Sequence, residues 1–213
     1  MTGPKIEAID YSSPDKKVVG RAATILGEGG LVVAPTETRY GLLARADQAT
    51  VVSRLYSVKG RPASLPTAIF VKSITDAARY GTVNAAARRL AEKYLPGPLT
   101  LVLRASAVLD EPLVVEGKIG IRMSAAPFIT QLLRQVTFPV TATSANPSGG
   151  EELDTIDEIA RAFGGKIELY IDVGVLDNPV STVVDVSSDN AAIIRQGAIP
   201  DQELFSLLDS QLI

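Results

Sequence analysis

The chain has 213 residues, of which 46% are hydrophobic and 21% charged, with a formal net charge of −3; this balance is typical of a folded, water-soluble protein. It contains no cysteine and no histidine, which excludes thiolate nucleophiles, disulfides, Cys/His zinc sites and every catalytic triad built on histidine. Residues 1–5 lack the apolar core of a signal peptide, and no apolar run approaches the ~18 residues of a membrane span. We therefore expect a cytoplasmic protein with no membrane contact.

Charge is distributed unevenly along the chain. Residues 1–110 carry 15 Lys/Arg and 9 Asp/Glu, whereas residues 111–213 carry 6 and 15. Such a separation can gather cationic side chains on one surface that binds an anionic ligand. The alternative is that both halves present ordinary solvated faces.

Apolar periodicity predicts helices that alternate with strands. Ser13-Pro14-Asp15 is typical of a helix N-terminus, with Ser13 as the cap, and Gly29-Gly30 would end that helix. Further along, Thr155 and Glu158 have the spacing of a capping box. The other expected elements, in chain order, are a strand over 31–34, a helix near 49–58, a strand over 68–71, a helix over 84–94, strands over 99–103 and 119–122, a helix over 127–136, a strand over 140–143, a helix through 163, and strands over 169–171, 182–186 and 192–194.

The alternation indicates a layered α/β fold. The last two strands follow each other without a helix, which predicts a hairpin and therefore a mixed sheet. No composition break marks a linker and no internal repeat is present, so we expect a single domain over residues 1–213.

Generic nucleotide motifs are absent: there is no GxxxxGK[ST] phosphate loop and no GxGxxG fingerprint. A nucleotide site would therefore have to be built from cationic side chains and hydroxyl groups. Residues 35–42, Pro-Thr-Glu-Thr-Arg-Tyr-Gly-Leu, directly follow a predicted buried strand, where layered α/β sheets commonly bind ligands. The competing interpretation of this segment is a turn that merely ends the strand.

Two loops contribute further candidates. In Lys59-Gly60-Arg61-Pro62, a turn at Gly60 would let both cations flank a polyphosphate, although the segment could equally be a surface loop. Residues 141–150 concentrate hydroxyl, amide and glycine groups that suit phosphate or ribose oxygens, but such compositions are also common in turns.

Two arginines, Arg122 and Arg195, each follow a predicted strand. An arginine beside a pocket is well suited to a carboxylate or phosphate because its fork binds two oxygens at once. The alternative is a surface arginine with a buried stem.

Taken together and in this order, these segments resemble the YrdC family of threonylcarbamoyl-AMP synthases over nearly the whole chain. A single motif of this kind is weak, whereas seven in order and at compatible spacing are specific. The matching segments are Pro35 to Leu42, Lys59 to Pro62, Pro96 to Thr100, Gly120 to Arg122, Ser144 to Gly149, Ser181 to Asp185 and Arg195 to Gly197.

The resemblance implies a twisted mixed sheet flanked by helices, with a concave and positively lined cavity. It also implies a nucleotidyltransferase reaction in which L-threonine, bicarbonate and ATP give threonylcarbamoyl-AMP and pyrophosphate. That product serves the threonylcarbamoyl modification of adenosine 37 in tRNAs that read ANN codons. The chain ends soon after Arg195, as expected for the short form without an additional C-terminal domain.

The resemblance also assigns roles to individual residues. Lys59 and Arg61 would act as catalytic residues on the ATP phosphates, and the further nucleotide contacts would come from Ser144, Asn146 and Arg195. The L-threonine site would consist of Thr38, Arg122 and Ser181, with Arg122 paired to the amino-acid carboxylate. Magnesium would arrive with ATP, held mostly by phosphate oxygens and water, so no protein metal ligand is assigned.

Partners follow from the same resemblance: tRNA is a candidate ligand, and contact with a tRNA threonylcarbamoyl-transferase complex would be transient.

Three departures from the family pattern leave room for a diverged relative. Arg39 replaces an apolar residue, Met123-Ser124 replaces an apolar-proline pair, and the stretch from Gly174 to Ser181 is abbreviated. The main alternative is a non-catalytic RNA-binding protein, and another is an enzyme that uses carbamoyl phosphate in place of threonine.

Overall fold

The computed structural model describes residues 4–188 and 190–208. Its helices are α1 (Lys16–Gly27), α2 (Ala49–Lys59), α3 (Ile74–Ala77), α4 (Ala85–Tyr94), α5 (Pro127–Gln135), α6 (Ile156–Phe163) and α7 (Asp201–Leu208), with a 3-10 turn η1 (Gly164–Lys166). Its strands are β1 (Ile6–Ala8), β2 (Val32–Pro35), β3 (Tyr40–Leu43), β4 (Ala68–Phe70), β5 (Gly81–Thr82), β6 (Leu99–Ala105), β7 (Val114–Val115), β8 (Lys118–Arg122), β9 (Val140–Ser144), β10 (Leu169–Asp172), β11 (Thr182–Asp185) and β12 (Ala192–Arg195).

The described strands form one hydrogen-bonded sheet in the order β1-β10-β2-β3-β9-β4-β8-β6-β11-β12, with β5 added beside β6 and β7 beside β8. Parallel pairs such as β10–β2 and β4–β8 occur beside antiparallel pairs such as β2–β3 and β6–β8. The predicted α/β architecture with a mixed sheet flanked by helices is thus confirmed. The predicted hairpin is also present, because β11 and β12 pair antiparallel.

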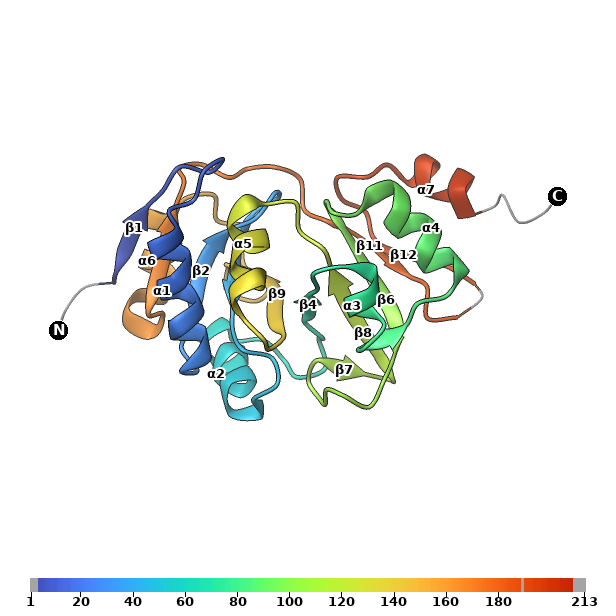
Figure 1. Cartoon of the computed structure of the whole chain (residues 1–213), viewed down its shortest axis with the longest axis horizontal. Coiled ribbons are helices and arrows are strands. Elements are labelled where there is room, and N and C mark those ends of the chain that lie inside the picture. Colours follow the sequence, from blue (N-terminus) through green and yellow to red (C-terminus); the bar gives the residue numbers. More distant parts are fainter. Residues whose placement is uncertain (1–3, 189, 209–213) are drawn as a thin grey trace.

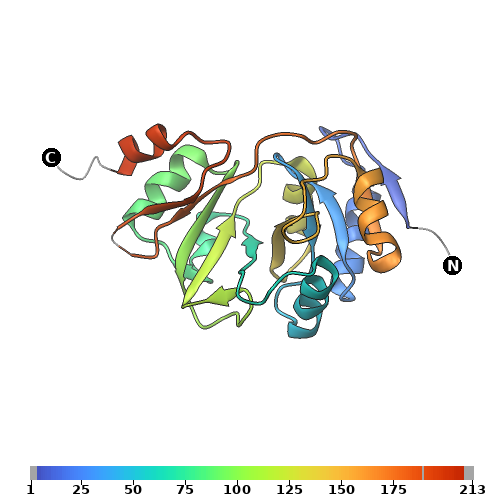
Figure 2. The same ribbon diagram turned by 180° about the vertical axis from the view of Figure 1, so that it is seen from behind.

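Strand periodicity divides the core into two apolar clusters. Along β2 and the residue before it, Val32 and Ala34 pack with α1 and α5, while Leu31 and Val33 pack with α2 and α6. This alternation is expected for a strand that is covered on both faces. Figure 1 shows α1 and α5 in front of this half of the sheet, and Figure 2 shows α2 and α6, in teal and orange, from behind.

Of the two helix N-caps predicted from the sequence, one is confirmed and one is wrong. The predicted capping box is present: the Glu158 N–H donates to Thr155 Oγ1, and the Glu158 carboxylate accepts the Thr155 N–H at 3.1 Å. Helix α1, however, is capped by Asp15 and not by Ser13, because the Asp15 carboxylate accepts the Lys17 N–H at 2.7 Å. The helix consequently starts after Pro14, which lies outside it.

The segment 35–42 differs from the simple turn considered above. Its second half, Tyr40 to Leu42, belongs to β3, which pairs with both β2 and β9 and is fully buried. The Tyr40 hydroxyl donates to the Gly174 carbonyl at 2.7 Å and accepts the Val173 N–H at 3.0 Å. Only residues 36–39 form the turn, and the hairpin fixes both ends of it.

The sequence prediction missed β1, β3, α3, β5, β7, η1 and α7. All but α7 have only two to four residues, too few to show a clear apolar period. Helix α7 does carry apolar residues at helical spacing, Leu204 with Leu207 and Leu208, and was not predicted. Among the described residues, no helix is long and apolar enough to cross a membrane. The organisation of residues 1–213 as a single domain stays a prediction.

The chain passes unusually close to itself at Gly197. A Cβ atom placed there would lie 2.3 Å from the Val180 carbonyl oxygen. We expect Gly197→Ala to lower the free energy of unfolding by about 1–3 kcal/mol, because the backbone after β12 must move away from β11. Urea unfolding followed by circular dichroism measures this loss. Gly165→Ala is the control, since a Cβ there meets no atom within 4 Å; equal unfolding midpoints for the two variants would contradict the prediction.

Candidate active site

A cavity of about 550 Å³ lies among β3, β4, β6, β7, β8, β9, β11 and β12 and the turn that joins β2 to β3. Its charged lining is more cationic than acidic, with Arg39, Arg61, Lys118, Arg122 and Arg195 against Glu116, Glu152 and Asp185. Of the residues predicted to form the site, the cavity brings together Thr38, Arg61, Arg122, Ser144, Ser181 and Arg195. Lys59 and Asn146 do not belong to its lining. The role of each residue stays a prediction.

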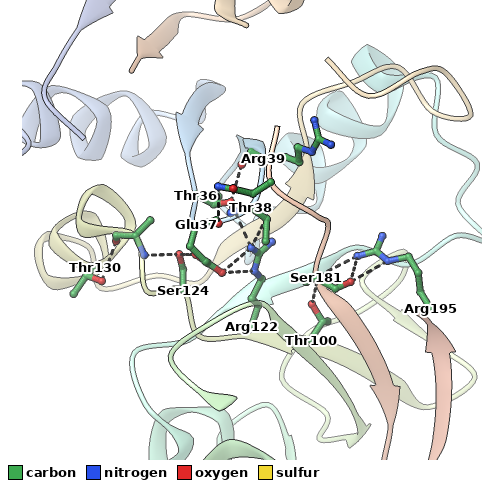
Figure 3. A network of polar contacts seen from close by, with 12 residues as sticks. Thr36, Glu37, Thr38, Arg39, Thr100, Arg122, Ser124, Thr130, Ser181 and Arg195 are labelled. Carbon is green, nitrogen blue, oxygen red and sulfur yellow. Dashed lines mark hydrogen bonds and ion pairs between the residues drawn. The ribbon is translucent and has the colours of Figure 1, made fainter. Parts of the chain in front are cut away.

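The first arginine cluster is centred on Arg122 at the end of β8 (Figure 3). Its Nη2 donates to Thr38 Oγ1 at 2.6 Å and to Glu37 Oε1 at 2.7 Å, and its Nε donates to the same carboxylate oxygen at 3.3 Å. Ser124 Oγ donates to the other oxygen of Glu37 and accepts the Ala126 N–H at 3.1 Å. The turn between β2 and β3 thus supplies the groups that hold Arg122.

Sequence reasoning did not assign Glu37 or Ser124 to the site. Glu37 occupies the variable position of the Pro-Thr-x-Thr segment, and Ser124 is one of the departures from the family pattern. A signal was nevertheless present, because a carboxylate two residues after a buried strand needs a cationic partner if it is not exposed. Which arginine would supply the partner depended on the sheet order.

The second arginine cluster joins the start of β11 to the end of β12 (Figure 3). Arg195 Nη2 donates to the Ser181 carbonyl at 2.8 Å and to Ser181 Oγ at 3.0 Å. The Ser181 hydroxyl also lies 3.0 Å from Thr100 Oγ1. Burial, and then the nearby Arg122 cation, lower the pKa of Arg195; the cavity therefore holds cationic groups that repel one another.

Lys59 lies beneath the loop that follows β9 and not on the cavity wall. It is the last residue of α2, which ends at Gly60 in the left-handed conformation (φ 62°), and it is only 3% exposed. Its Nζ donates to the Ser144 carbonyl and, at 2.7 Å, to the Asn146 carbonyl. Burial, and secondarily the Arg61 cation, lower its pKa to about 7. The lysine therefore fixes the loop whose side chains were predicted to contact the nucleotide.

Arg61 and Asn146 are held by local contacts. Arg61 donates from Nε to the Leu65 carbonyl at 2.9 Å and from Nη2 to the Pro66 carbonyl at 2.8 Å. Asn146 donates to the Gly150 carbonyl at 3.2 Å and accepts the Ser144 hydroxyl. Both cavity loops are thus ordered by their own backbone carbonyls.

The departure at Arg39 is compensated by two acidic residues. Arg39 Nε lies 3.1 Å from the Glu152 carboxylate and Nη1 pairs with Asp154, with 18% of the arginine side chain exposed. Arg39 is therefore neither an outward-pointing surface cation nor a free cation beside the cavity. The abbreviated stretch after Gly174 is attached to the same region, since the Leu176 N–H donates to the Asp154 carbonyl at 2.9 Å.

Residues 24–197 match the sequence model of the Sua5/YciO/YrdC family, which carries the description "Telomere recombination". The chain belongs to this family. It is 37% identical to the threonylcarbamoyl-AMP synthase of Pyrococcus abyssi over 188 residues, 86% of this chain and 55% of that protein. It is 31% identical to the threonylcarbamoyl-AMP synthase of Rattus norvegicus over 227 residues, 98% of this chain and 80% of that protein. The family assignment thus rests on nearly the whole chain.

The crystal structure of P. abyssi Sua5 complexed with L-threonine matches the fold with a TM-score of 0.88 and 32% sequence identity. The alignment covers 95% of this chain and 60% of that structure. The chain therefore spans little more than half the length of this archaeal relative, and the resemblance concerns the part that the two proteins share.

The buried lysine predicts a pH dependence of stability. Between pH 7 and its ordinary pKa of 10.5, Lys59 is largely neutral in the folded protein but protonated in the unfolded chain. Because the unfolded state then binds more protons, stability should rise as the pH rises from 7 to 9, by at most about 1.4 kcal/mol per pH unit. Urea unfolding at pH 7, 8 and 9 measures this slope.

Lys59→Met should remove the rise, and it should also lower stability because two carbonyl groups lose a donor. Lys17→Met is the control, since Lys17 is exposed on α1. A slope in Lys59→Met as steep as in the unmodified protein would show that another group titrates.

Proposed function

We propose that this protein synthesises threonylcarbamoyl-AMP from L-threonine, bicarbonate and ATP, with release of pyrophosphate, for the threonylcarbamoyl modification of adenosine 37 in tRNA. The observation that carries the proposal is the convergence of Arg122 with Thr38, and of Arg195 with Ser181, on one cavity that also includes Arg61. Family members named threonylcarbamoyl-AMP synthase support a nucleotidyltransferase-type enzyme.

The cavity offers groups suited to both reactants. Thr38, Arg122 and Ser181 would hold L-threonine, with the guanidinium of Arg122 paired to its carboxylate. Arg61, Ser144 and Arg195 would contact the phosphates and nucleoside of ATP. Lys59 and Asn146 would assist from the loop after β9, where Lys59 already determines the path of the backbone.

The chemistry that we propose needs no histidine. The threonine amine forms an N–C bond with the carbon of bicarbonate, water leaves, and the product is a carbamate. A carbamate oxygen then bonds to the α-phosphorus of ATP, the bond from that phosphorus to the bridging oxygen breaks, and pyrophosphate leaves with its electron pair. Negative charge grows on the leaving pyrophosphate, which fixed cations such as Arg61 and Arg195 would stabilise. Alignment of the reactants supplies much of the remaining acceleration.

Magnesium would enter with ATP. Within residues 4–188 and 190–208, no group of three or more acidic residues gathers to form a metal site. We expect the ion to be held mostly by phosphate oxygens and water, as Mg²⁺ commonly is, and its contribution would be to neutralise phosphate charge. The labile product would pass to a tRNA-modifying complex, with which contact would be transient, and tRNA itself is a candidate ligand.

Arg61→Ala and Arg122→Ala should each reduce the formation of threonylcarbamoyl-AMP by about 100-fold or more, because each removes a charged donor aimed at a developing or bound anion. Mass spectrometry detects the product, and pyrophosphate release is measured with and without L-threonine and bicarbonate. Arg88→Ala, on the exposed face of α4, is the control and should keep full activity.

Pyrophosphate release that does not depend on threonine would contradict the proposed reaction. Absence of the product together with RNA binding that weakens steeply with salt would favour the non-catalytic alternative. Turnover with carbamoyl phosphate in place of threonine would favour the other enzyme.

ATP binding should be accompanied by proton uptake at pH 8. Lys59 is largely neutral there because its pKa lies near 7, and phosphate anions placed nearby stabilise the ammonium form and raise that pKa. Isothermal titration calorimetry in buffers of different ionisation enthalpy measures the protons taken up. Lys59→Met should abolish most of the uptake; equal uptake by both proteins would exclude Lys59 as its source.

A further inference from the structure

Glu37 pairs with Arg122 but does not itself line the cavity. Its neighbours in the turn, Thr36, Thr38 and Arg39, do line the cavity. Its side chain is 12% exposed, and that of Arg122 is 11% exposed. Neither charge could remain unpaired at this depth without a large loss of stability.

The pairing uses only part of the Arg122 guanidinium. Nε and Nη2 donate to Glu37, and Nη2 also donates to the Thr36 and Thr38 hydroxyl groups. Within the described part of the chain, Nη1 of Arg122 makes no hydrogen bond. This atom is also not fully buried. One edge of the guanidinium is therefore fixed by the protein, while the remaining amino group is available to a ligand in the cavity.

Ser124 fixes the carboxylate in turn. The residue is 5% exposed, its hydroxyl oxygen accepts the Ala126 N–H at 3.1 Å, and the hydroxyl proton is donated to Glu37 Oε2. Because the backbone determines the position of Ser124 Oγ, the serine transmits that position to Glu37 and through it to Arg122. Figure 3 shows this row of contacts from Ser124 to Arg122.

We propose that Glu37 is a positioning residue, held by Ser124, that presents Nη1 of Arg122 to the carboxylate of the amino-acid substrate. The inference rests on the proposed function, since it concerns the threonine end of the same cavity. An arginine on a flexible stem loses rotamer freedom when it binds a ligand. Pairing with Glu37 removes that cost before the substrate arrives.

The test is the affinity for L-threonine without ATP, measured by calorimetry, together with the affinity for ATP. Glu37→Ala should weaken threonine binding at least tenfold, because Arg122 loses its fixed orientation, while ATP affinity should stay within twofold. Glu37→Gln, which preserves the size and shape of the side chain, and Ser124→Ala should each weaken threonine binding by about threefold. Glu7→Gln is a matched control, since Glu7 pairs with Arg21 at 2.6 Å far from the cavity.

A double variant distinguishes positioning from general stability. If Glu37 acts through Arg122, adding Glu37→Ala to Arg122→Ala should weaken threonine binding no further. Threonine affinity unchanged in Glu37→Ala, or in Glu37→Gln where the alanine variant does not fold, would overturn the inference. So would equal losses of threonine and ATP affinity, which indicate a structural role. If the unmodified protein neither binds L-threonine nor forms threonylcarbamoyl-AMP, the proposed function itself fails.

Discussion

The largely buried cation of Arg122 must be paired. The turn between β2 and β3, which forms part of the cavity wall, supplies the groups that pair with it. The arginine ends a central strand, β8, whereas its carboxylate partner Glu37 arrives from the turn between β2 and β3. These strands are separated in the sheet by β9 and β4, so the ion pair ties together two distant parts of the sheet. Removing one partner would leave the other charge buried and alone. The pair therefore links the folding of the hairpin to the shape of the cavity.

Positive charge in the cavity lining is not fully compensated. Neighbouring cations contribute to lowering the pKa values of Lys59 and Arg195, in addition to the larger effect of burial. A bound anion would relieve this repulsion. Because the fold already holds the cations close together, the binding of a phosphate is favoured. In the proposed reaction the same fixed charges would stabilise the leaving pyrophosphate, so no histidine would be needed for proton transfer.

Residues that depart from the family pattern form polar contacts of their own. Arg39, in place of an apolar residue, pairs with Glu152 and Asp154 in the loop after β9. Ser124 supplies the hydroxyl group that holds Glu37. Where the family pattern has apolar residues and a proline, this chain has charge pairs on the rim, whose partial exposure limits their contribution to stability, and a hydrogen bond from Ser124.

The sequence by itself determined the local structure and the segments that form the site. Apolar periodicity and caps such as Thr155 predicted the longer helices and strands, because these signals act within one element. Motif residues at strand ends reached a common cavity, since such ends converge in α/β sheets. Only the tertiary structure decided that Lys59 turns under a loop and that Glu37 pairs with Arg122. Each orientation depends on a partner about 85 residues away, and electrostatic pairing at that separation is set by strand order, which local sequence does not encode.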